Sequence, residues 1–187
     1  MAERCLILAA VVAAVFLPGA IGGSPSFPDN NPDLGAYQNE GNCFPLKDTW
    51  YMIYRNYEYD PYYGGLNCLI VTEIGPYDGT SATLQAQYGG NKTAKVKATP
   101  ISTPGYTVKN ADNFVSLDDP EINYNMTSVY TDCSRCKVLR HSYIDNGKGC
   151  SLWQPKKALG EDVSCCKFIY DLICGASPKY QVCDNVE

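Results

Sequence analysis

Cysteine dominates the reactive chemistry of this 187-residue chain, which contains ten cysteines. Cys5 lies in an apolar N-terminal leader, and the nine that follow are Cys43, Cys68, Cys133, Cys136, Cys150, Cys165, Cys166, Cys174 and Cys183. So many thiols behind such a leader are typical of a disulfide framework formed in an oxidising compartment. Because nine is an odd number, the sequence predicts at least one thiol that is free or paired to something outside the chain.

Other chemistry is poorly supported by the residue pattern. Cys133 and Cys136 have the C-x-x-C spacing of redox and zinc motifs, but no second such pair exists and His141 is the only histidine. There is no Gly-x-Ser-x-Gly elbow, and isolated carboxylates such as Glu73 are better explained as solvated strand-end groups. We therefore expect no enzyme activity, no cofactor and no metal site.

Tyrosine is used fifteen times, against five phenylalanines and two tryptophans. Rings with polar tips suit a flat, cationic or amphipathic ligand, because the ring face holds a cation while the hydroxyl forms a hydrogen bond. For most of these tyrosines an ordinary role on a β-strand is the alternative.

The charge pattern argues against nucleic acid as a partner. The formal net charge is -5 and no run of lysine and arginine occurs, so the attraction to phosphate that nucleic-acid-binding proteins use is missing.

Residues 1–22 have the pattern of a cleavable signal peptide: a short cationic start, an apolar run over 5–17 and small residues before Gly23. A membrane anchor is the alternative, but the run is shorter than the ~20 residues of a spanning helix, and no later apolar run is long enough to cross a membrane. The sequons at Asn91 and Asn125 also fit a secreted glycoprotein.

Two parts are predicted for the mature chain. Residues 23–42 are rich in proline, asparagine and glycine, which predicts a flexible N-terminal arm. The body, 43–187, contains short β-like runs split by turn residues, at 49–57, 67–75, 81–88, 92–101, 112–117, 122–131, 136–143 and 149–154. Eight antiparallel strands are the number that closes a small ligand-holding barrel, with a sandwich as the alternative.

After Pro155 the apolar spacing changes to that of a helix. Val163, Cys166, Ile169 and Ile173 recur at helical intervals, and Gly175 follows as a helix terminator. The sequence predicts a helix over 161–174 that packs on the barrel wall.

Several stretches, in their order and spacing, resemble the tick salivary lipocalins, the family that includes histamine-binding proteins, lipid-mediator binders and complement inhibitors. The stretches are Trp50-Tyr51-Met52-Ile53, Tyr57-Glu58-Tyr59-Asp60-Pro61-Tyr62-Tyr63-Gly64, Cys68-Leu69-Ile70-Val71, Cys136-Lys137-Val138-Leu139, Cys150-Ser151-Leu152-Trp153 and Cys165-Cys166-Lys167-Phe168. The Gly-x-Trp opening usual in lipocalins is reduced to the Trp of Asp48-Thr49-Trp50. The resemblance implies an eight-stranded antiparallel lipocalin barrel with a C-terminal helix outside it.

The resemblance also implies disulfides from Cys43 to Cys165, Cys136 to Cys166 and Cys68 to Cys183. A fourth bridge between Cys150 and Cys174 is our own hypothesis. It leaves Cys133 over, and Cys133 is then a candidate for a disulfide-linked dimer.

A ligand site follows by the same resemblance. Tyr57, Asp60 and Tyr63 match an aromatic, a carboxylate and a second aromatic of the family's amine-binding motif, and Phe114, Tyr124 and Trp153 match further pocket rings. An outward glycan at Asn125 would independently turn Tyr124 inward, because strand side chains alternate. For Asp60, which precedes Pro61, a purely local role in a turn is an equal alternative.

Departures from the family pattern weaken a second amine site. Ala98, Lys137 and Ser151 stand where the family has acids, and a lysine repels a cation. If Lys137 points inward it could meet the carboxylate of a lipid, as could Arg55 or Arg140, although a solvated outer face is the alternative for all three.

The sequence therefore favours a secreted protein that sequesters a small host mediator, first a biogenic amine such as histamine or serotonin. A lipid mediator (leukotriene, thromboxane, fatty acid or sterol) and a protein-binding complement or immune modulator are the alternatives.

Overall fold

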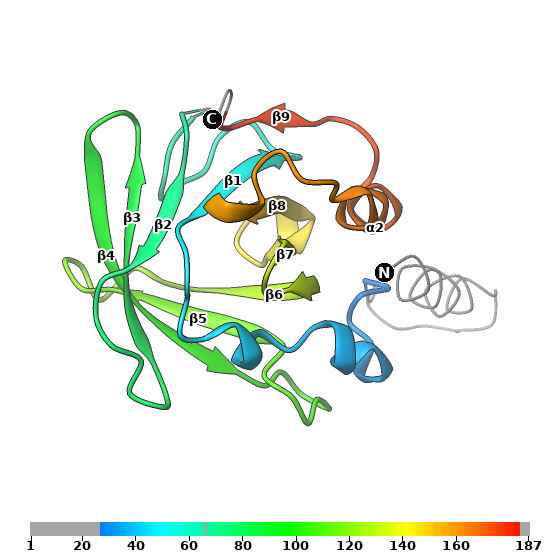
Figure 1. Ribbon diagram of the computed structural model, residues 1–187, viewed down its shortest axis with the longest axis horizontal. Helices are drawn as coiled ribbons and strands as arrows, with labels where there is room; N and C mark the ends of the chain where they lie inside the picture. Colours follow the sequence, from blue (N-terminus) through cyan, green and yellow to red (C-terminus); the bar gives the residue numbers. More distant parts are fainter. Residues whose placement is uncertain (1–26, 66, 184–187) are drawn as a thin grey trace.

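The computed structural model describes residues 27–65 and 67–183, and their main element is a closed antiparallel β-barrel (Figure 1). Its strands are β1 (Trp50–Arg55), β2 (Ile70–Glu73), β3 (Ala82–Tyr88), β4 (Lys92–Ile101), β5 (Ala111–Ser116), β6 (Asn123–Asp132), β7 (Cys136–His141) and β8 (Gly149–Pro155). Each strand pairs with the next in sequence, and β8 pairs with β1.

A short pairing of β1 with β2 closes the barrel, with Trp50 opposite Val71 and Tyr51 opposite Ile70. A two-residue strand, β9 (Tyr180–Gln181), adds to β1 outside the closure. The predicted eight-stranded barrel is confirmed, and closure rules out the sandwich.

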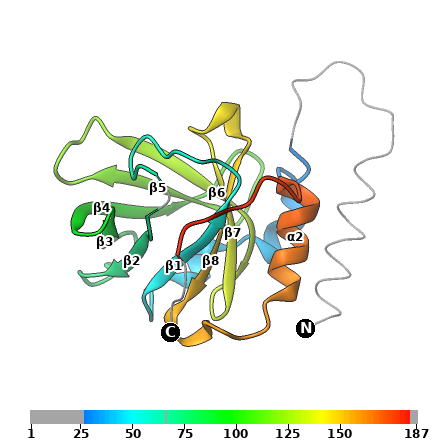
Figure 2. The ribbon, with the colours of Figure 1, turned by 90° about the horizontal axis from the view of Figure 1, so that it is seen from above.

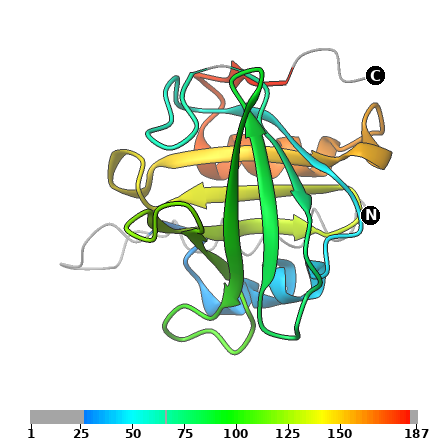
Figure 3. The same cartoon turned by 90° about the vertical axis from the view of Figure 1, so that its left-hand side faces the viewer.

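The C-terminal helix α2 (Ser164–Cys174) packs on the outside of β6, β7 and β8 (Figure 2). It lies on the opposite side of the barrel from β3 and β4, which face the viewer in Figure 3. Every residue of β7 and β8 is buried, because one face of these strands lines the barrel and α2 covers much of the other. The predicted helix is therefore confirmed.

The N-terminal arm is ordered over its described residues, 27–42. It forms two short 3₁₀ helices, η1 (Pro32–Tyr37) and η2 (Glu40–Cys43), and it buries Leu34, Gln38 and Glu40. Two of its acids form buried ion pairs with cations of the barrel wall: Asp29 with Arg140 and Glu40 with Lys137. Over these residues, buried ion pairs hold the segment against the barrel.

Four disulfides join described residues: Cys43 to Cys133, Cys68 to Cys183, Cys136 to Cys166, and Cys150 to Cys174. The last three confirm the expected pairings. The bridge from Cys43 to Cys165 is wrong, because the end of η2 brings Cys43 to Cys133 in the β6–β7 turn.

Cys133 is therefore not left over, and no cysteine in the described part of the chain is free. The dimer through Cys133 is thus also wrong.

The signal peptide predicted at 1–22 lies outside the described residues. Among 27–65 and 67–183, no helix combines the length and apolar character needed to cross a membrane. Asn91, in the β3–β4 turn, and Asn125, on β6, are both exposed, as glycan acceptors must be.

Candidate functional site

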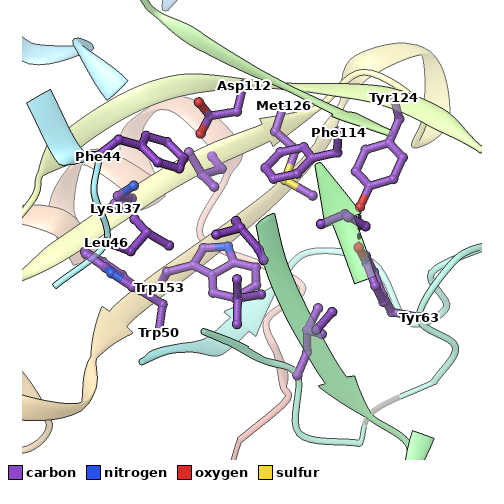
Figure 4. A pocket seen from close by; sticks show the side chains of 16 residues that line it. Phe44, Leu46, Trp50, Tyr63, Asp112, Phe114, Tyr124, Met126, Lys137 and Trp153 are labelled. Carbon is purple, nitrogen blue, oxygen red and sulfur yellow. Dashed lines mark hydrogen bonds between the residues drawn. The ribbon is translucent and has the colours of Figure 1, made fainter. Parts of the chain in front are cut away.

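The barrel encloses a cavity of about 60 Å³ (Figure 4). Its wall is mostly apolar and aromatic and comes from all eight barrel strands and the segments that cap them, with Phe44, Leu46, Trp50, Leu69, Val71, Leu84, Ala86, Val96, Met126 and Leu139 among the lining residues. Two charged side chains, Asp112 and Lys137, also face it.

Strand alternation places the key side chains in two rows. Asp112 and Phe114 both point inward from β5, and they stand opposite Met126 and Tyr124 of β6 respectively. Asn125, between the last two, is exposed. The alternation inferred from the Asn125 sequon is therefore the alternation that the structure has.

Four of the six predicted ligand residues line the cavity: Tyr63, Phe114, Tyr124 and Trp153. The Phe114 and Tyr124 rings stack with centroids 5.4 Å apart. The hydroxyls of Tyr63 and Tyr124 are hydrogen-bonded to each other. Tyr63 reaches the cavity from a tight loop closed by reciprocal backbone hydrogen bonds between Asp60 and Gly64.

The other two predicted residues, Tyr57 and Asp60, do not line this cavity. Asp60 is fully buried, and its Oδ1 accepts the backbone N–H groups of Tyr62 and Tyr63 at 2.9 and 3.2 Å. Its Oδ2 accepts the hydroxyls of Tyr57 at 3.1 Å and Tyr143 at 3.2 Å. The turn role weighed for Asp60 is the one that the geometry supports.

Arg55 supplies the positive charge beside Asp60, with Nη1 3.9 Å from Oδ2. Arg55 is itself buried and donates hydrogen bonds to the carbonyls of Tyr57, Glu58, Gly64 and Gly65. A protein cation therefore already occupies the position next to Asp60. The solvated outer face considered for Arg55 is wrong, and so it is for Lys137 and Arg140, which are also buried.

Hydrogen bonds connect the Asp60 cluster to the cavity wall through His141. Its ring nitrogens lie 3.0 Å from the Tyr143 hydroxyl and 2.6 Å from Ser151 Oγ, which accepts the indole N–H of Trp153 at 2.7 Å. Burial lowers the pKa of His141 to about 3, with the Arg55 charge adding to the effect. His141 is therefore neutral and serves to orient the Trp153 ring.

Charged groups lie at the end of the cavity beneath the N-terminal arm, away from the Tyr63–Tyr124 hydroxyl pair (Figure 4). Lys137 Nζ pairs with Glu40 Oε2 at 2.6 Å and lies over the Trp50 ring. Asp112 Oδ1 is buried and has no hydrogen-bond partner among the described residues. Burial, together with the smaller effect of the Glu40 charge and against the opposing effect of Lys137, raises the pKa of Asp112 to about 8.

The sequence matches a known protein family over most of its length. Residues 28–186 match the family described as tick histamine binding protein. The chain belongs to this family. No curated protein sequence matches it as a relative.

Solved structures show that this family member has a lipocalin fold. The crystal structure of AM182 with serotonin is 14% identical, has a TM-score of 0.56, and the match covers 85% of this chain and 95% of that one. Lobster apocrustacyanin A1 is 15% identical with a TM-score of 0.52, over 81% and 82% of the two chains. Family and fold are those of ligand-binding proteins, and this tick histamine-binding protein family member is accordingly a binding protein and not an enzyme.

The sequence analysis did not identify two acids at the end of the cavity beneath the arm, Asp112 and Glu40. Asp112 had a detectable signal, because it precedes the predicted pocket residue Phe114 by two positions and so shares its face of the strand. Glu40 had none, since it lies in a segment whose composition predicts no fixed structure.

Proposed function

We propose that this protein binds one small aromatic amine as a cation inside the barrel and, once secreted, sequesters it from the host. The observation that carries the proposal is the buried Asp112 side chain, whose Oδ1 has no hydrogen-bond partner among the described residues, in a cavity lined by aromatic rings. An ammonium placed there gains an ion pair and ring faces that replace its lost water.

The end of the cavity that contains Asp112 can accept a single positive charge. Glu40 and Lys137 neutralise each other at 2.6 Å, and the Asp60 carboxylate has Arg55 beside it. Asp112 is the one acid among the described residues that line the cavity, so ionising it leaves one uncompensated negative charge. We infer a stoichiometry of one amine per chain.

Size supports an amine over a lipid mediator. The cavity of about 60 Å³ is smaller than the roughly 150 Å³ that holds a benzene ring. Its walls must therefore move apart even for a small aromatic amine, and a long acyl chain requires a much larger expansion. Lys137, the cation suggested for a lipid carboxylate, already has Glu40 as its counter-ion. The serotonin bound by AM182 makes that amine a natural first ligand to test.

Calorimetric titration with serotonin, histamine, a leukotriene and a fatty acid tests the proposal. We expect saturable 1:1 binding of at least one amine and none of the lipids. Saturable binding of a lipid, with no heat from either amine, would overturn the assignment.

Secretion and glycosylation are parts of the same proposal. They are supported by the leader pattern of residues 1–22 and by the exposed sequon residues Asn91 and Asn125. Expression in a eukaryotic secretory host, with mass measurement before and after enzymatic deglycosylation, tests both.

A further inference from the structure

We propose that the Tyr63–Tyr124 hydroxyl pair makes the cavity selective for amines whose aromatic ring carries a hydroxyl at the end opposite the ammonium. This inference rests on the proposed function and names the class of amine that the same site prefers.

The cavity has polar groups at two ends and apolar walls between them. Asp112 and Lys137 lie beside Phe44 at one end, and the two tyrosine hydroxyls meet at the other, with Phe114 between (Figure 4). Because Asp112 and Phe114 are successive inward positions of β5, their rows are about 7 Å apart. An aryl-ethylamine bound to Asp112 therefore directs the far edge of its ring toward the tyrosine pair.

The pair has one hydrogen to spare. Burial raises the pKa of both Tyr63 and Tyr124, so each hydroxyl keeps its proton. Two hydroxyls bonded to each other use one of their two hydrogens, and each of these oxygens has the other as its hydrogen-bond partner among the described residues. The second hydrogen is left without a protein acceptor.

The surroundings of the pair offer little compensation. The cavity side chains beside it, such as Leu84, Ala86 and Met126, have no acceptor oxygen. The rings of Tyr62, Tyr88 and Tyr143 also pack against the pair, with centroids 4.6 to 5.3 Å away, but among the described residues the pair hydroxyls are hydrogen-bonded only to each other. A ligand hydroxyl supplies the missing acceptor, whereas the bare ring of a deoxy amine leaves a buried donor unsatisfied and loses affinity.

Two ligand pairs that differ by one ring hydroxyl give the test: serotonin against tryptamine, and tyramine against phenethylamine. A neutral hydrogen bond in a buried site is worth roughly three- to tenfold in affinity. We expect the hydroxylated member to bind tighter by about this factor in at least one pair. The preference should disappear in the Tyr63→Phe/Tyr124→Phe double variant while the deoxy amine still binds.

Tyr106→Phe is the matched control, because Tyr106 is a buried tyrosine that donates its hydroxyl to the Asp29 carbonyl at 3.1 Å and does not line the cavity. This variant should keep the parent preference for the hydroxylated amine. Thermal unfolding of both this variant and the double variant should remain cooperative, which shows that both are folded.

The outcomes separate the two proposals. Equal affinity for both members of each pair in the parent protein, or a preference that survives in the double variant, overturns the role of the hydroxyl pair and leaves amine binding standing. Binding of histamine but of none of the four amines overturns the role of the hydroxyl pair alone, and absence of binding by all five overturns both proposals.

Discussion

Lys137 forms an ion pair with Glu40, with Nζ 2.6 Å from Oε2, whereas Oδ1 of Asp112 on the same cavity wall has no hydrogen-bond partner among the described residues. The lysine thus neutralises an acid of the N-terminal arm, and the acid of the barrel wall stays available. Both partners of the ion pair are almost completely buried, so the pair fixes the arm over this end of the barrel.

Glu40→Gln should be strongly destabilising, because it leaves Lys137 as a buried cation with no fixed counter-ion. Loss of one partner of such a pair costs about 3–5 kcal/mol, to be measured by chemical denaturation. Lys137 would then be drawn to Asp112 and weaken amine binding as well. Asp145→Asn, which removes a solvent-exposed pair with Lys148, is the control and should change stability by about 0.5 kcal/mol or less. Equal effects of the two variants would refute the importance of the buried pair.

Asp60→Asn should affect folding more than ligand binding. The carboxylate accepts two backbone N–H groups and two tyrosine hydroxyls, and weakening these bonds to a charged group costs about 1.5–3 kcal/mol of stability. Amine affinity in the folded variant should stay within about threefold of the parent, since Asp60 does not line the cavity. A selective loss of amine binding with unchanged stability would restore the role that the family resemblance implied.

Serotonin affinity should rise with pH between about 6 and 8. Asp112 has a raised pKa of about 8 in the free protein, so below that pH it is protonated, and an ammonium that pairs with the ionised form must displace the proton. Glu40 and Lys137 are the charged groups that contribute to this shift. The affinity should change by up to tenfold per pH unit, with proton release visible as a dependence of the calorimetric heat on the buffer. A pH-independent affinity with no proton release would contradict this coupling.

Mass mapping of the non-reduced protein should yield a cross-linked peptide containing Cys43 and Cys133, and a non-reducing gel should show a monomer. A linkage of Cys43 to Cys165 would show instead that the pairing implied by the family resemblance was right. This test needs no variant and does not depend on the ligand.

The barrel was predictable because strand alternation and turn residues are local signals, and β4, for example, has the bounds that its sequence indicated. The sequence could not decide between the ligand role and the turn role of Asp60, because its partner Tyr143 reaches it only through the closed fold. The Cys43 bridge failed for a similar reason: it depends on the path of an arm that is ordered by buried ion pairs rather than by its composition.

Tyr63, Phe114, Tyr124 and Trp153 were placed by resemblance, and all four line the cavity. The resemblance implies Asp60 as the acid that holds a cation and contains no indication of Asp112.

Calorimetric titration of Asp112→Asn beside the parent protein and Asp60→Asn tests the central claim most directly. We expect the parent to bind one serotonin or histamine per chain and Asp112→Asn to lose about 1.5–3 kcal/mol of binding free energy, the range for a hydrogen bond to a charged group, with its fold intact by circular dichroism. Amine affinity that is unchanged in Asp112→Asn, or lost only in Asp60→Asn, would contradict the account.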